Sequence, residues 1–87
     1  MTYLVKILVE KRKSIQSPEA SAIQRATNML DYKISELKMS KYFSYLSHKN
    51  SEEEVRDEAK SLSDKLFANP TMEDYKILSI EEIVKKR

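Results

Sequence analysis

Few residues in this chain are of types that could catalyse a reaction. His48 is the only histidine and there is no cysteine, so a thiolate nucleophile and a cysteine-based zinc site are excluded. A catalytic or metal-binding histidine needs partner groups at a defined geometry, and no zinc-type spacing surrounds His48. Polar residues follow it directly in the sequence. We therefore expect His48 to be a solvated loop residue, and we expect no catalytic residue and no metal site in this chain.

The carboxylates also argue against a free-standing enzyme. They form two runs, three glutamates at residues 52–54 and two at residues 81–82. An acid–base pair needs two carboxylates in different environments at a fixed separation, whereas adjacent residues point in different directions. The chain contains no glycine at all, which excludes the phosphate-binding loops of the Walker and dinucleotide types.

Two basic runs, at residues 11–13 and 85–87, could contact phosphate groups or an acidic partner. The net charge is only +2, which is too small to indicate nucleic-acid binding by itself. Tyr42, Phe43 and Tyr45 could stack on bases, but the RNP motif of such sheets requires glycine, so packing is the better interpretation. Two alternatives stay open: a small nucleic-acid-binding or ribosome-associated protein, and a ligand-sensing domain.

Three segments have the composition or periodicity of strands. Residues 3–11 alternate with a period of two, residues 34–47 end in a run of aromatic residues, and residues 75–83 form the third segment. No apolar run is long enough to span a membrane, and the beginning of the chain lacks the pattern of a secretory signal. We therefore expect a cytoplasmic protein without a membrane partner.

Two helices are predicted between these strands. The first begins after Ser17, whose side chain can cap it, because the following proline suits the first helical position. It should end near Asp31, where we expect a positive φ at this residue or at the tyrosine after it. The second begins at Ser51, which forms a capping box with Glu54, and ends at Asn69, before a proline.

These elements predict a single α+β domain over residues 1–87, with the order β-α-β-α-β. We expect an antiparallel three-stranded sheet with both helices on one face. Each helix should bury one apolar stripe against the sheet. The stripe of the first helix is Ala22, Ile23, Ala26, Met29 and Leu30, and that of the second is Val55, Ala59, Leu62 and Leu66.

The strands carry apolar residues on both faces, as Leu4 and Leu8 beside Val5 and Ile7 illustrate. No further element remains to cover the second face. Self-association through that face is the simplest prediction, giving a homodimer or a tetramer. The alternative is a monomer in which long lysine and glutamate side chains shield the second face.

The segment KLFANPTMEDY, residues 65–75, resembles the KLLAN…EDY signature of PurS-type small subunits of formylglycinamide ribonucleotide amidotransferase. Further similar segments follow the family order along nearly the whole chain: the opening strand, residues 3–9; Ser-Pro-Glu, residues 17–19; Leu-Asp-Tyr, residues 30–32; and the segment ending in Ser-Lys-Tyr, residues 37–42. The sequence departs from the family pattern at Ser17, Asp31 and Ser40, where the family usually has aspartate, glycine and glycine. Ser17 keeps a capping side chain, whereas Ser40 puts in doubt any role that needs close backbone approach before Lys41.

The resemblance implies a non-catalytic subunit of an ATP- and glutamine-dependent ligase of purine synthesis. Its partners would be the synthetase (large) subunit and the glutaminase subunit, which this chain, usually as a dimer, would bridge while helping ammonia to pass between them. ATP and Mg would be used by the complex, and this chain would bind no cofactor and no nucleic acid. The expected partner-binding residues are Lys41, Tyr42, Asn69, Glu73, Asp74 and Tyr75.

Overall fold

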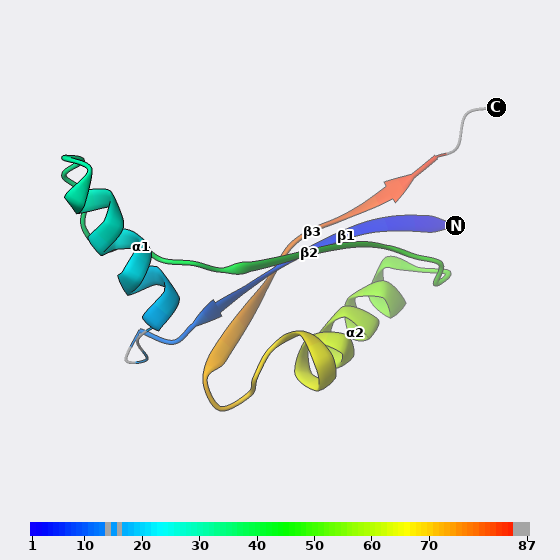
Figure 1. Cartoon of the computed structure of the whole chain (residues 1–87). Helices are drawn as coiled ribbons and strands as arrows, with labels where there is room; N and C mark the ends of the chain where they lie inside the picture. Colours follow the sequence, from blue (N-terminus) through cyan, green and yellow to red (C-terminus); the bar gives the residue numbers. More distant parts are fainter. Residues whose placement is uncertain (14, 16, 85–87) are drawn as a thin grey trace.

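Strands and helices alternate along the chain, as predicted. The computed structural model describes residues 1–13, 15 and 17–84. The elements are β1 (Thr2–Lys11), α1 (Pro18–Met29), β2 (Lys41–Ser47), α2 (Glu52–Leu62), a π-helical turn η1 (Ser63–Phe67) that continues α2, and β3 (Glu73–Ile83) (Figure 1). The α+β class and the β-α-β-α-β order are confirmed.

The three strands form one antiparallel sheet in the order β2-β1-β3. β1 lies in the centre, where Val9 is opposite Lys41 of β2 on one side and Tyr75 of β3 on the other. A register shift opposite Lys6 and Ile7 marks a β-bulge in the β1–β3 ladder.

The core lies between the sheet and α2. Alternate β1 residues face α2 and are buried with α2 side chains, so the core cluster consists of Tyr3, Val5, Ile7, Val9, Val55, Ala59 and Ala68. Phe43 of β2 stacks on Phe67 with 4.3 Å between ring centroids. Ser47 ties β2 to α2, because its hydroxyl donates to Glu58 Oε1 at 2.6 Å.

The prediction that Leu66 belongs to the buried stripe of the second helix is wrong, because Leu66 is 74% exposed. The π turn is the reason. The Ala68 amide donates to Ser63 O at 2.9 Å, a bond that spans one residue more than an α-helical bond. The buried face after this turn therefore shifts by one residue, and Phe67 packs against the core in place of Leu66.

The helix caps follow the predictions. Ser17 Oγ accepts from the Ala20 amide at 3.3 Å, and Ser51 Oγ accepts from the Glu54 amide at 3.2 Å. Asp31 has a φ of 68°, the left-handed conformation expected where α1 ends. Glu36 also has a positive φ, of 56°, which the sequence did not indicate.

The sequence predicted both helices on one face of the sheet, and in the structure only α2 lies there. α2 packs across one face, whereas α1 projects beyond the end of the sheet (Figure 1). β1 ends at Lys11, so the stretch predicted to be extended over residues 34–47 pairs with β1 only from Lys41 onward. The residues before Lys41 run beside α1 instead, where the Leu37 amide donates to Gln24 Oε1 at 2.7 Å. We call residues 18–40 the α1 arm.

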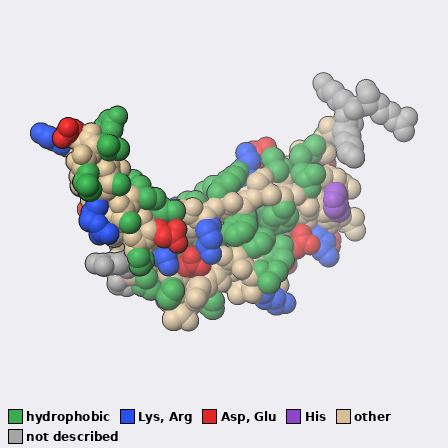
Figure 2. Space-filling view, in the orientation of Figure 1, with side chains coloured by type: hydrophobic (Ala, Val, Ile, Leu, Met, Phe, Trp, Pro, Cys, Tyr) green, Lys and Arg blue, Asp and Glu red, His purple; other side chains and the backbone are tan. Residues whose placement is uncertain are grey.

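The apolar stripe predicted to bury α1 is largely exposed on this arm. Ala20 is the buried residue of α1, whereas Ile23, Leu30 and Met29 are exposed, the last of them 84%. The reason is the same projection, since none of the strands β1, β2 and β3 lies beneath the arm (Figure 1). Hydrophobic side chains appear along the arm and near the sheet, and the outline of the molecule is hollowed between them (Figure 2).

The sheet face away from α2 has no helix over it within the part of the chain that the structure describes. We call it the open face. Leu4 lies opposite Leu46 and Leu8 opposite Tyr42 on neighbouring strands of this face. Leu46, Tyr42 and Leu78 are exposed although they are large and apolar. Side chains along β1 therefore alternate between the two faces of the sheet, as predicted, and one face is buried while the other carries exposed apolar side chains.

Candidate partner-binding site

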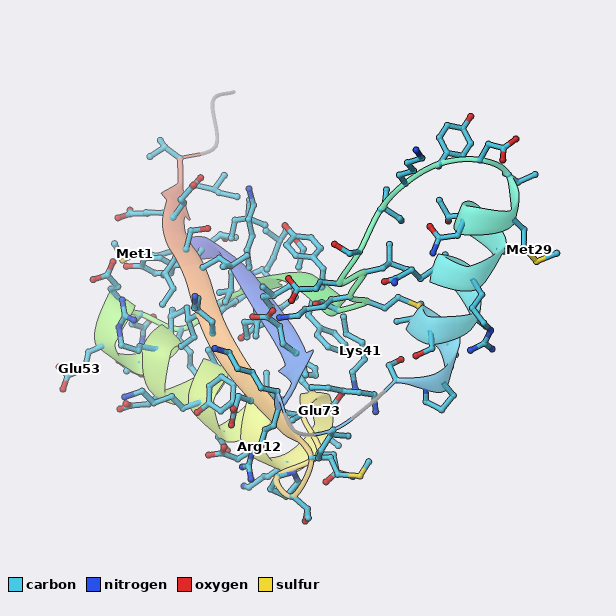
Figure 3. All side chains as sticks on the ribbon, turned by 90° about the vertical axis from the view of Figure 1, so that its left-hand side faces the viewer. Met1, Arg12, Met29, Lys41, Glu53 and Glu73 are labelled. Atoms are coloured by element: carbon cyan, nitrogen blue, oxygen red, sulfur yellow. The ribbon has the colours of Figure 1, made fainter. Side chains whose placement is uncertain are left out.

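The six residues predicted to bind a partner lie at one end of the sheet. Lys41 and Tyr42 begin β2, while Glu73, Asp74 and Tyr75 begin β3. Asn69 lies in the turn that joins η1 to β3, which we call the 69–75 turn. Figure 3 shows Lys41 and Glu73 at this end, together with Arg12, which directly follows β1.

Glu73 holds the turn and β2 together. Its Oε1 accepts from the Asn69 amide at 2.8 Å and from Lys41 Nζ at 3.1 Å. Lys41 Nζ also donates to the backbone oxygen of Phe67 at 3.2 Å. The Glu73 side chain is 10% exposed. The Asn69 amide chiefly, and Lys41 in addition, lower the pKa of Glu73, while burial acts in the opposite direction.

Asn69 closes the turn by local hydrogen bonds. Its Oδ1 accepts from the Thr71 amide at 2.9 Å. Its backbone oxygen accepts from the amides of Met72 at 3.1 Å and Glu73 at 2.7 Å. This is the behaviour of an asparagine in a turn, and it gives Asn69 a structural role.

Arg12 also holds this turn, which the sequence analysis missed. Its guanidinium donates to Pro70 O at 2.9 Å, to Thr71 O at 3.2 Å and to Asp74 Oδ1 at 3.2 Å. Its amide donates to Met72 O at 3.0 Å. The sequence feature that could have indicated this role is the basic run at residues 11–13, which the sequence analysis interpreted only as a possible contact with phosphate groups or an acidic partner.

The two tyrosines of the predicted set lie on different faces. Tyr42 directly follows Lys41 in β2, but it belongs to the open face and is 55% exposed. Tyr75 packs against the core cluster, and burial raises its pKa, with a further increase from the charge and hydrogen bond of Asp64. The structure therefore separates the predicted site into the 69–75 turn and the open face.

The described residues contain no group of three histidines, cysteines or carboxylates that could hold a metal ion. His48 lies in an exposed loop, with its Nδ1 at 3.5 Å from Thr2 Oγ1. No helix among residues 1–13, 15 and 17–84 is long and apolar enough to cross a membrane. The second basic run, residues 85–87, lies outside the described residues.

Replacing Glu73 by glutamine should lower the free energy of unfolding by about 1 kcal/mol at neutral pH, since a charged acceptor and an ion pair are lost. The folded protein holds the pKa of Glu73 below its ordinary value. This stabilisation is therefore complete above the pKa of the unfolded chain and is lost as the pH falls through the folded pKa. Urea unfolding of the wild type and Glu73→Gln at pH values on both sides of this range measures the difference.

The control is Glu53→Gln, at an exposed position of α2. It should have a much smaller effect at neutral pH. A difference between wild type and Glu73→Gln that stays constant down to strongly acidic pH would show that the Glu73 charge does not stabilise the turn.

The structure defines a small α+β domain with an uncovered sheet face and a hydrogen-bonded turn at one end of the sheet. Comparison with known proteins gives the family. The family model for PurS, described as phosphoribosylformylglycinamidine (FGAM) synthase, matches residues 4–81. The chain therefore belongs to the PurS family, the small subunits of FGAM synthase in purine biosynthesis.

Individual relatives agree with this assignment. The PurS subunit of phosphoribosylformylglycinamidine synthase from Methanocaldococcus jannaschii is 32% identical over 82 residues, covering 93% of this chain and 98% of the relative. The structure of PurS from Thermus thermophilus superposes with a TM-score of 0.84 at 25% identity, covering 97% of this chain and all of that one. A chain in the structure of PurLQS from Thermotoga maritima has the same fold, with a TM-score of 0.82 and 19% identity over 88% of this chain and 95% of that one.

Proposed function

We propose that this chain is the non-catalytic subunit that joins the synthetase and glutaminase subunits of FGAM synthase and assists the transfer of ammonia between them. The observation that carries the proposal is membership of the PurS family over residues 4–81 of the 87. A chain of the same fold forms part of the PurLQS structure from Thermotoga maritima, which supports association with such subunits. In this proposal ATP and Mg act on the other subunits, and this chain binds no cofactor.

Two surfaces at different places on the domain support a joining role. The 69–75 turn lies at the end of the sheet, and the open face lies on the side away from α2. We assign self-association to the open face and contact with another subunit to the turn. A homodimer built in this way carries two copies of the turn, because a twofold interface uses the same patch of both chains. We place this complex in the cytoplasm, because its family acts in purine synthesis.

The proposed partner-binding residues contribute in different ways. Lys41 and Asn69 both donate to Glu73, and the three residues shape the turn. The Asp74 side chain is 71% exposed and is presented to a partner. Alanine at Asp74 or Glu73 should weaken assembly more than it weakens folding. Asp74 gives the cleaner test, because its ion pair with Arg12 is exposed and contributes little to stability, whereas the largely buried Glu73 accepts two hydrogen bonds that stabilise the turn.

The test is reconstitution with the synthetase and glutaminase subunits. We expect the glutamine-dependent formation of the amidine product to need this chain. The reaction supplied with free ammonia should depend on it far less, because free ammonia does not have to pass between subunits. Both rates are measured with and without the chain, and assembly is followed by size-exclusion chromatography.

Two outcomes would contradict the proposal. Equal glutamine-dependent rates with and without the chain, and no complex on the column, would remove the joining role. In that case, salt-sensitive binding of RNA in a filter assay would favour the nucleic-acid alternative.

A further inference from the structure

A cleft with a volume of about 410 Å³ lies where the end of β1, the start of α1 and the returning segment of the arm meet. Half-buried and buried apolar side chains line part of it, among them Ile15, Ala20 and Leu37. Hydrogen bonds donated by their own backbone amides hold two of these residues in place. The Ile15 amide donates to Arg12 O at 2.9 Å, and the Leu37 amide donates to Gln24 Oε1 at 2.7 Å.

The charged residues of the cleft are mainly basic. Its cations are Lys11, Arg12, Lys13 and Lys38, and its carboxylates are Glu10 and Asp74. Arg12 and Asp74 form an ion pair at 3.2 Å and largely neutralise each other. Lys11 lies opposite Glu73 in the β1–β3 ladder. Lys13 and Lys38 together still exceed the charge of Glu10, so the cleft keeps an excess of positive charge.

Two of these lysines are available to a partner. Lys13 and Lys38 are exposed, and among the described residues neither has a carboxylate within ion-pair distance. They come from opposite sides of the cleft, one from the loop after β1 and one from the returning segment. Two lysines beside the apolar lining of the cleft favour a ligand that carries both carboxylates and an apolar side chain.

We propose that this cleft docks an acidic segment of one of the two other FGAM synthase subunits, with an apolar side chain of that segment seated on Ile15 and Leu37. The inference rests on the proposed function and adds the surface and its chemistry to it. The cleft adjoins the 69–75 turn through Arg12 and Asp74. Turn and cleft therefore form one continuous contact surface, in which the lysines steer the acidic segment toward the turn.

The experiment compares two double variants that change the net charge equally. The test variant carries Lys13→Glu and Lys38→Glu. The control carries Lys49→Glu and Lys60→Glu, at exposed positions outside the cleft. Each protein is titrated calorimetrically into the purified synthetase subunit and, separately, into the glutaminase subunit, at about 50 mM and about 300 mM salt. Thermal unfolding and size-exclusion chromatography confirm that both variants are folded and have the wild-type oligomeric state.

We expect the test variant to bind one of the two subunits at least about tenfold more weakly than the control does. The affinity of the wild type for that subunit should fall at the higher salt concentration, and the affinity of the test variant should fall less. If the wild type binds both subunits and the two variants bind equally well, the joining role stands and the cleft is not the docking site. If the wild type binds neither subunit, the proposed function and this inference fail together. If the test variant instead loses only the binding of a single-stranded RNA oligonucleotide, the cleft belongs to nucleic acid and the inference is overturned.

Discussion

Replacing Ile7 by alanine should lower the free energy of unfolding by about 3 kcal/mol, because the substitution leaves a cavity in the centre of the core. Ile7 is fully buried in the central strand, opposite Phe43 of β2 and Ile77 of β3. Small domains have total stabilities of roughly 5–15 kcal/mol, so this single change removes a large part. Urea unfolding followed by circular dichroism, at one fixed protein concentration, measures the loss.

The matched control is Leu66→Ala, because Leu66 was assigned to the buried stripe by its spacing and is exposed in the structure. An exposed substitution of this kind should change the free energy of unfolding by less than about 0.5 kcal/mol. Equal losses for Ile7→Ala and Leu66→Ala would contradict the position of the core and the shift caused by the π turn.

Replacing Leu46 by glutamate should dissociate the proposed homodimer. Leu46 is 52% exposed on the open face, opposite Leu4, at a place that a second copy of the chain would cover. An unpaired carboxylate buried in such an interface costs about 3 kcal/mol or more, which weakens association by about a hundredfold. Sedimentation equilibrium over a range of concentrations measures the dissociation constant.

Leu66→Glu serves as the control, since it places the same charge at an exposed leucine on the other side of the molecule. It should leave self-association unchanged. A dimer of Leu46→Glu as stable as that of the control would remove the open face as the site of self-association. A dimer that is lost only in Leu46→Glu would also allow a test of whether the monomer still supports glutamine-dependent activity.

The candidate site could be predicted from the sequence only in part. The six residues that the resemblance implied come from distant parts of the chain, and the structure brings them to one end of the sheet. The resemblance did not separate Glu73, which is largely buried and shapes the turn, from Asp74, which is exposed. That distinction depends on the contacts of Lys41 and Arg12, which lie 32 and 62 residues away in the chain from their partners Glu73 and Asp74.

Features that depend on near neighbours in the chain were determined by the sequence alone. Ser17 and Ser51 cap helices because each hydroxyl needs only an amide three residues later. Asp31 takes a positive φ because the helix ends there, and the order of strands and helices follows from local periodicity.

Only the tertiary structure decided what depends on distant residues. Three features depend on which segments pair and pack. They are the strand order β2-β1-β3, the position of the α1 arm beyond the end of the sheet, and the packing of Phe67 against the core where Leu66 was predicted. The periodicity of a strand shows that it has two different faces, but it does not show which face a helix will cover. The register of β1 with its two neighbouring strands places Tyr42 on the open face. The same register places Arg12 beside the 69–75 turn, where it donates to the turn backbone.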